Sequence, residues 1–256
     1  MTIARDRAAV IRTSVTEKIR AEGTAIGTTL KSTSPSVAEA LGYTPLDFLF
    51  IDRQHGSPVY ERLEEIVRAA DVHDLPVLVR VPKDDLHLIT YCLDIGVTGI
   101  MLPQTEDVDF VREAAEHVRY GDGRSLATTS RAAGFGSLDR DAYIDFVNEE
   151  VALIPQIESE AGAELVPELA AIEAVRSLAI GPGDLSYSMG VPAGSDEVLA
   201  VVDQLIDSAT EHGCPIGSFV GTPRAIERYA GRAAFLVYNS DVGLLTSHFN
   251  SVLDGE

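Results

Sequence analysis

The sequence predicts a closed (β/α)8 barrel, and three observations lead to this expectation. Short apolar runs alternate with amphipathic segments of helical period along most of the chain. Strands that alternate with helices need crossover connections, which favour a parallel sheet. Eight such runs in 256 residues match the number of strands in a closed barrel. A doubly wound open sheet is the alternative, but no glycine-rich nucleotide-binding pattern follows the first run.

The elements follow in order from this pattern. The first 20 residues predict a helix, because their apolar positions recur at spacings of three and four. Strands are expected at 23–30, 47–52, 76–82, 99–104, 151–158, 175–182, 215–220 and 234–240. The segments between them, such as 57–74 and 195–213, have an apolar helical face and begin at a serine suited to an N-cap. With no linker or repeat, residues 1–256 are expected to form a single domain.

One segment breaks the alternation. Residues 121–138 are rich in Gly, Ser and Thr and contain Arg124 and Arg131. A long loop in a compact domain is usually functional or disordered, and the two arginines favour function. We therefore expect this loop to help select the substrate.

Composition limits the partners and the compartment. The chain has 40 acidic and 20 basic residues, a formal charge of -20, which argues against nucleic acid and membrane surfaces as partners. Lysine occurs only at positions 18, 31 and 83, and an acidic, lysine-poor surface is typical of proteins from a salt-rich cytosol. Cys92 and Cys214 have no paired spacing and are expected to be reduced thiols. The N-terminus has no apolar signal core, so a cytoplasmic location is expected.

Polar side chains collect at the ends of five consecutive predicted strands, where a barrel forms its active site. These residues are Asp52 and His55 after the second strand, Arg80 in the third, Gln104 in the fourth, Gln156 and Glu158 in the fifth, and Asp184 after the sixth. Each has a structural alternative, because strand-end carboxylates often cap the next helix and a lone histidine is often a surface residue. Their concentration on one side of the ring favours a site.

The charges within strands are harder to explain structurally. Gln156 and Glu158 share one face of an otherwise apolar strand. A carboxylate there must be paired, bound to a metal or solvated in the barrel mouth. Together with Asp184 it makes an oxygen-ligand site suited to Mg²⁺ or Mn²⁺. Arg80 inside "VLVRVP" is expected to face an anion, either a fixed carboxylate or a substrate.

Five segments together resemble the HpcH/HpaI aldolases, a family of metal-dependent class II pyruvate aldolases with a (β/α)8 barrel. They are "FLFIDRQHG", "VLVRVP", "CLDIGVTGIMLPQTE", "IPQIESEAG" and "LAIGPGDLSYSMG", and the resemblance runs from about residue 23 to 245. It implies that Glu158 and Asp184 hold Mg²⁺ or Mn²⁺, with Co²⁺ as a further candidate. It also implies that Arg80 stabilises the enolate and that His55 and Asp52 act as an acid/base pair.

The resemblance further implies that Gln156 and the backbone of Gly183 contact the keto-acid. It implies a homo-oligomer, a hexamer built as a trimer of dimers, in which the last helix, from Asp241, is exchanged between subunits. One departure is notable: the family has a glutamate before the histidine, where this chain has Gln54. That replacement removes a negative charge close to the implied metal.

The expected function is reversible cleavage of a 2-keto-4-hydroxy acid to pyruvate and an aldehyde. One alternative is a lyase of malyl- or citramalyl-CoA type on the same barrel. Another is a barrel that binds a keto-acid without turnover, which only Gln54 supports. A Schiff-base aldolase is the third, because Lys31 and Lys83 both follow strands, although neither lies in an apolar strand interior.

Overall fold

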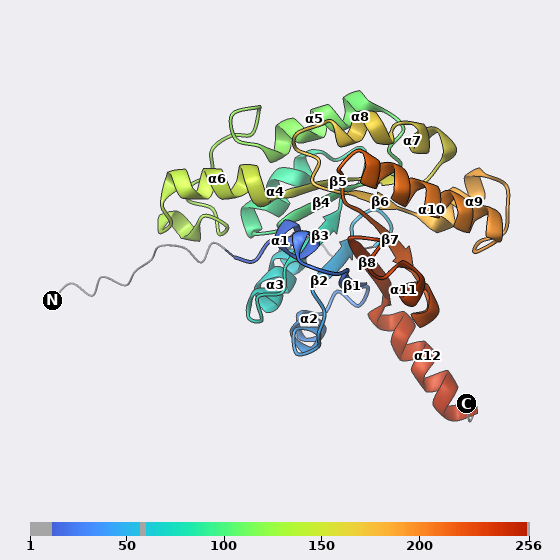
Figure 1. Cartoon of the computed structure of the whole chain (residues 1–256). Helices are drawn as coiled ribbons and strands as arrows, with labels where there is room; N and C mark the ends of the chain where they lie inside the picture. The colour runs from blue at the N-terminus through green and yellow to red at the C-terminus, as the bar shows by residue number, and fades with distance from the viewer. Residues whose placement is uncertain (1–11, 57–59, 255–256) are drawn as a thin grey trace.

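The computed structural model describes residues 12–56 and 60–254, and these form the predicted (β/α)8 TIM barrel. All strand pairs are parallel, consecutive strands are neighbours, and β8 closes the ring against β1 (Figure 1). The strands are β1 Ala25–Thr29, β2 Phe48–Asp52, β3 Val77–Arg80, β4 Gly99–Leu102, β5 Ala152–Ile157, β6 Leu178–Ile180, β7 Ile216–Val220 and β8 Phe235–Ser240. Each lies within or overlaps a run expected from the sequence.

Helices surround the strands (Figure 1). They are α1 Val15–Arg20, α2 Pro35–Leu41, α3 Tyr60–Asp71, α4 His87–Ile95, α5 Val108–Val118, α6 Arg140–Glu150, α7 Glu160–Glu164, α8 Val166–Ala170, α9 Pro182–Ser188, α10 Asp196–Glu211, α11 Pro223–Tyr229 and α12 Asp241–Asp254. The helix expected in the first 20 residues is confirmed as α1, and residues 1–11 lie outside the described part. The segment 57–74 contains α3, and its residues 57–59 are also outside that part.

The half of the barrel interior nearest the N-terminal ends of the strands is filled with side chains. Phe48 and Phe235 meet edge to face with ring centroids 5.9 Å apart. Their rings occupy the space beside Gly27 and Gly217, where an added Cβ would lie 2.3 Å from Phe48 and 2.4 Å from Phe235. Val15 of α1 joins this inner cluster from below. The helix α1 therefore closes the N-terminal end of the barrel.

The 121–138 loop lies at that same N-terminal end, so the expectation that it helps select the substrate is wrong. It follows α5 and leads through α6 to the start of β5. Arg131 donates to Ile95 O at 2.6 Å and to Asp71 Oδ2 at 2.6 Å, at the ends of α4 and α3. Arg124 donates to Asp94 Oδ1 at 2.7 Å. These arginines fasten the loop to helix ends on the face opposite the strand ends.

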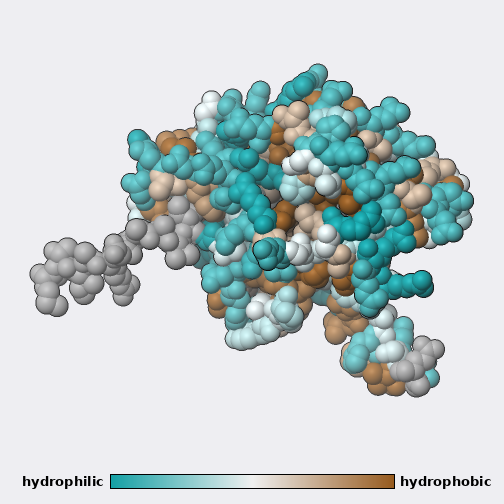
Figure 2. Space-filling model, viewed as in Figure 1, coloured by the Kyte–Doolittle hydropathy of each residue, from teal (hydrophilic) through white to brown (hydrophobic). Residues whose placement is uncertain are grey.

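The surface is mostly hydrophilic on the face seen in Figure 2. Helix α12 projects from the barrel (Figure 1), and hydrophobic colour appears along it in Figure 2. Its exposed apolar residues include Leu245, Phe249 and Leu253. Within the described ranges, no helix combines the length and the apolar character needed to cross a bilayer. The two cysteines are buried free thiols, as expected.

Candidate active site

The strand ends bring the predicted site residues together on neighbouring strands. Asp52 ends β2 and Arg80 ends β3, and these two residues are paired in register. Gln156 lies in β5 and Glu158 directly follows it. Asp184 lies in the first turn of α9, just after β6. The C-terminal ends of parallel strands meet at one face, so these side chains converge at the barrel mouth.

Arg80 is fixed by three neighbours. Its Nε donates to Asp52 Oδ1 at 3.0 Å and its Nη2 donates to Asp52 Oδ2 at 2.7 Å, a bidentate pair. Its Nη1 donates to Gln156 Oε1 at 3.0 Å and lies 3.5 Å from Glu158 Oε1. The guanidinium also lies over the Phe50 ring, 5.8 Å from its centroid. Arg80 is thus held in one orientation, with a positive charge beside Glu158.

Asp52 orients Arg80 and a backbone turn. Burial is the largest single influence and disfavours its charged form, but the hydrogen bonds and charge of Arg80, together with the backbone N–H groups of His55 and Gln54, hold the pKa of Asp52 below its usual value. Its Oδ1 also accepts the backbone N–H groups of Gln54 at 3.0 Å and of His55 at 3.3 Å. The resemblance implies that Asp52 and His55 act as an acid/base pair, whereas the contact of Asp52 is with the His55 backbone and not with its ring. The His55 side chain is exposed at the rim.

Glu158 is a buried carboxylate next to a second carboxylate, Asp184. It is 6% exposed, and its Oε2 accepts the backbone N–H of Gln104 at 2.7 Å. Burial and the adjacent carboxylate of Asp184 raise the pKa of Glu158 to about 7, although the N–H of Gln104 and the charge of Arg80 oppose the rise. The sequence thus predicted correctly that these two carboxylates come together.

Two positions support Glu158 in ways that the sequence did not indicate: Gln104, expected only as a polar side chain of the fourth strand, and Gly181. Gln104 has φ +49°, a left-handed conformation that is uncommon outside glycine and that directs its N–H at Glu158. Gly181 provides space: an added Cβ would lie 2.7 Å from Glu158 Cγ and 2.9 Å from Gln156 Nε2. Gln104 acts through its backbone, so its residue type gave no signal of this role. Gly181 begins the "GPGD" segment that drew attention to Asp184.

The oxygen donors fit a divalent cation of the Mg²⁺ type. Glu158 and Asp184 provide two adjacent carboxylates, and Arg80 contacts Glu158 and is paired with Asp52. Within the described residues, no three His, Cys, Asp or Glu side chains gather in the manner of a closed metal cluster. Glu158 and Asp184 are therefore a two-carboxylate site, which suits Mg²⁺ or Mn²⁺ because these ions keep positions for water and substrate.

The lysines do not resemble Schiff-base nucleophiles. Lys31 and Lys83 are exposed. The Nζ of Lys83 donates to Gln104 O at 3.3 Å and lies over the Phe110 ring, 5.4 Å from its centroid. A lysine nucleophile needs an apolar or cationic environment that favours the neutral amine. Neither lysine has such an environment.

Known proteins share this architecture and sequence. The model of the family described as HpcH/HpaI aldolase/citrate lyase matches residues 26–247. A 2-dehydro-3,6-dideoxy-6-sulfogluconate aldolase of Pseudomonas putida is 33% identical over 241 residues, 92% of this chain and 93% of the relative. A 2-keto-3-deoxy-L-rhamnonate aldolase of Shigella sonnei strain Ss046 is 28% identical over 243 residues, 93% of this chain and 89% of the relative.

A solved structure extends the likeness to three dimensions. The crystal structure of an HpcH/HpaI aldolase/citrate lyase family protein from Burkholderia cenocepacia J2315 superposes with a TM-score of 0.85. It is 29% identical, and the match covers 94% of this chain and 97% of that one. The chain belongs to the HpcH/HpaI aldolase/citrate lyase family and is an aldolase, a carbon–carbon lyase, of that family.

Proposed function

We propose that this aldolase depends on Mg²⁺ or Mn²⁺ and reversibly cleaves a 2-keto-4-hydroxy acid to pyruvate and an aldehyde. The observation that carries the proposal is the buried Glu158 carboxylate, which lies beside the carboxylate of Asp184 and has its Oε1 atom 3.5 Å from Nη1 of Arg80. A pair of adjacent carboxylates is stabilised by a cation. Metal dependence is also a property of the family.

A divalent cation held by Glu158 and Asp184 supplies Lewis acidity toward the 2-keto oxygen when it is bound. Arg80 stabilises the negative charge that develops on the same oxygen, and its fixed position makes that charge effective. Gln156 and the backbone around Gly183 contact the keto-acid, with Gln156 also holding Arg80 in place. Asp52 keeps the guanidinium oriented as negative charge grows nearby.

His55 moves the proton in this proposal. It takes the proton of the 4-hydroxyl as the C3–C4 bond breaks, so that C4 becomes the aldehyde carbonyl. The electron pair of that bond forms the enolate of pyruvate, which is then protonated at C3. The exposed position of His55 at the rim allows it to exchange protons with water. In the synthetic direction the same groups remove a proton from the methyl of pyruvate.

The substrate class follows from the relatives. Both aldolases described above are named for 2-keto-3-deoxy acids, one with a sulfonate and one with a deoxy-sugar chain. We propose a 2-keto-3-deoxy sugar acid as the natural substrate, because such acids carry the 4-hydroxyl that retro-aldol cleavage requires.

We also propose that the chain forms a homo-oligomer, a hexamer built as a trimer of dimers, in which α12 is exchanged between subunits. The support is the row of exposed apolar side chains Val242, Leu245, Phe249 and Val252 on a helix that projects from its own barrel. An exposed apolar surface of this kind marks an interaction site. Light scattering of the purified protein, with Leu245→Asp as the variant, tests this assembly.

An aldehyde panel tests the function. The protein is incubated with pyruvate and a series of aldehydes, including sugar-derived ones, with added Mg²⁺ or Mn²⁺ and at high and low salt. We expect carbon–carbon bond formation that a chelator abolishes and added metal restores. Activity that survives exhaustive chelation would exclude the metal mechanism, and a covalent adduct trapped by borohydride with pyruvate would favour Lys31 or Lys83. A parallel assay with malyl-CoA and citramalyl-CoA tests the thioester lyase alternative.

A further inference from the structure

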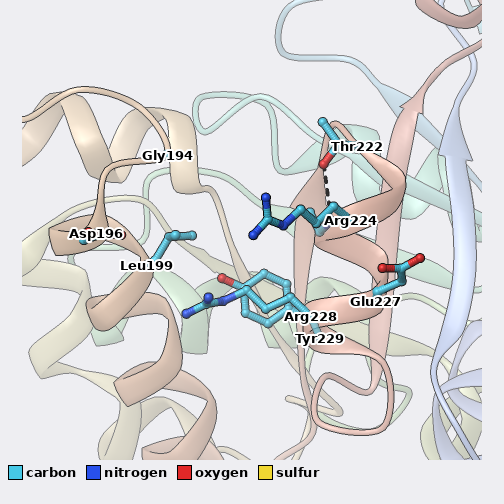
Figure 3. Close-up of a pocket in the computed structure, with 9 residues that line it drawn as sticks. Gly194, Asp196, Leu199, Thr222, Arg224, Glu227, Arg228 and Tyr229 are labelled. Atoms are coloured by element: carbon cyan, nitrogen blue, oxygen red, sulfur yellow. Dashed lines mark hydrogen bonds between the residues drawn. The ribbon is translucent and has the colours of Figure 1, made fainter.

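A cleft on the outer face of the barrel, between α10 and α11, is separate from the site at the strand ends. Its volume is about 740 Å³, and its lining includes Gly194, Leu199, Arg224, Arg228 and Tyr229. Figure 3 shows the side chains of Arg224 and Arg228 extending toward α10, while Glu227 points away from the cleft. The cleft therefore presents two cationic groups beside the aliphatic side chains of Leu199 and Ala225, in a lining that is otherwise mostly polar.

Charged residues on and next to these two helices form a row of ion pairs that ends at this cleft. Arg224 and Arg228 are spaced by four residues, which places them on one side of α11, and Arg232 lies in the turn that follows the helix. On α10, Asp203 and Asp207 have the same spacing. Arg232 donates to Asp203 Oδ1 at 2.6 Å and to Asp207 Oδ1 at 3.3 Å, and Arg228 donates to Asp203 Oδ2 at 2.6 Å.

The next position of this row on α10 has no acidic residue. Four residues before Asp203 the chain has Leu199, so no carboxylate continues the row opposite Arg224. Arg224 forms no ion pair within 4.0 Å with any residue in the described part of the chain. Asp196 also lines the cleft, in the first turn of α10, but it is not within that distance of Arg224. The cleft therefore begins at the point where the row of aspartates on α10 ends.

A second polar group in the lining lacks a partner. Tyr229 is 3% exposed, and its hydroxyl has no hydrogen-bond partner among the described residues. In Figure 3 this hydroxyl lies on the side of the ring that faces α10, next to the guanidinium of Arg228. Burial raises the pKa of Tyr229, so its O–H remains a donor at neutral pH. A buried donor without an acceptor costs free energy, which a ligand oxygen would recover.

From these contacts we propose that the α10–α11 cleft binds a small organic anion with a carboxylate or phosphate head. The head pairs with Arg224 and accepts from Tyr229 after a shift of Arg228, while an apolar portion packs on Leu199 and Ala225. Among the described residues no carboxylate lies within ion-pair distance of Arg224, so its guanidinium is available to an anion from solution.

Titration calorimetry with two probes tests the proposal. Inorganic phosphate and butyrate are titrated into the full chain in a low-chloride buffer, and the two arms distinguish a phosphate head from a carboxylate with an apolar tail. We expect saturable binding with a Kd on the order of 1 mM for at least one probe. Arg224→Gln is expected to weaken that binding roughly tenfold, because it removes a charge-assisted hydrogen bond.

Leu199→Asp is the sharper variant, because it supplies the missing carboxylate. It is expected to pair with Arg224 and abolish anion binding, whereas the neutral Leu199→Asn retains it. The aldolase kcat is expected to stay unchanged in all these variants. No saturable binding in the wild type, or equal binding in Arg224→Gln, would overturn the proposal. A change of oligomeric state in Leu199→Asp, measured by light scattering without loss of anion binding, would assign the cleft to a subunit contact instead.

Discussion

The two ends of this barrel both use arginine–carboxylate pairs, but with opposite charge balances. At the N-terminal end, three arginines (Arg12, Arg124 and Arg131) meet two aspartates, Asp71 and Asp94. Most of their remaining donors bond to backbone carbonyls, such as Gly96 O at 3.1 Å and Ile95 O at 2.6 Å, although Arg124 Nε is buried without a partner among the described residues. At the mouth, one arginine contacts two carboxylates, Asp52 and Glu158, and Asp184 adds a third carboxylate beside Glu158. The first cluster is largely paired within the protein, whereas the second leaves room for a cation.

This difference distinguishes a structural cluster from a functional one. Helix C-termini carry partial negative charge, so surplus arginines at the closed end are stabilised without a ligand. Surplus carboxylates at the mouth repel one another, and the raised pKa of Glu158 is the result. A pair of arginines in a long loop is thus weaker evidence for a site than two adjacent carboxylates, one of which is buried and has a raised pKa.

The largest effect on activity is expected from a substitution at the barrel mouth. Glu158→Gln removes one of the two proposed metal ligands, and we expect the metal-dependent rate of pyruvate formation to fall by on the order of 10³. The metal-free variant is expected to keep or raise its Tm, because the repulsion with Asp184 is gone. Glu160→Gln, an exposed neighbour on α7, is the matched control and should retain full rate. A fully active Glu158→Gln enzyme would refute the site assignment.

Arg80→Met removes the guanidinium that contacts Asp52 and Glu158 at the mouth. We expect kcat to fall by roughly 10²- to 10³-fold, because a preorganised charge at the developing oxyanion is lost. Arg80→Lys should recover little of this, because lysine cannot form the bidentate contact with Asp52. Steady-state kinetics on both variants provide the measurement. A loss confined to KM would show that Arg80 binds substrate and transition state equally.

Arg124→Met is the counterpart at the closed end. Its side chain is fully buried and paired with Asp94, so its truncation should cost about 2 kcal/mol of unfolding free energy. A Tm several degrees lower with unchanged kcat is the expected result, measured by thermal unfolding and the same rate assay. A large fall in kcat without a fall in Tm would contradict the structural role of this cluster.

Metal affinity is expected to depend on pH. The pKa of Glu158 is raised to about 7, so a proton competes with the cation below that pH. Binding of Mn²⁺ should therefore tighten as pH rises through 7 and level off above it. The stability of the metal-free protein should show the opposite trend with pH. The folded state favours protonated Glu158, because its pKa there is above that of the unfolded chain, so Tm should fall as pH rises from about 4.5 to 7. Calorimetry with and without Mn²⁺ measures both trends.

The smallest expected effect comes from Gln54→Glu. Its amide oxygen is buried without a partner among the described residues, next to the turn that Asp52 holds. A carboxylate there adds to the surplus negative charge of the mouth, and we expect Mn²⁺ to bind a few-fold more tightly. Gln54→Met controls for the loss of the amide. Unchanged affinity in Gln54→Glu would show that position 54 lies too far from the cation to affect it.

Much of the fold was predictable, because alternating apolar runs report the strands directly. The convergence of Glu158 and Asp184 was also predictable, since the ends of neighbouring strands must meet. The partner of Asp52 was not, because the register of β2 against β3 decides that it faces Arg80 rather than the His55 ring. The role of Gln104 depends on a backbone angle, and the position of Arg124 depends on where a long loop folds back, and neither is encoded in a local pattern.

Aromatic side chains fill the N-terminal half of the barrel interior and α1 covers that end, so the interior is open only at the C-terminal ends of the strands. Water, substrate and both products must then pass through one opening. Among the described residues, the inner cluster below the site consists of apolar side chains, so we expect the proton that completes pyruvate at C3 to arrive from the rim side. The two faces of the enolate are therefore unequal, and protonation in deuterated water with a labelled C3 should give a chiral methyl group of one configuration.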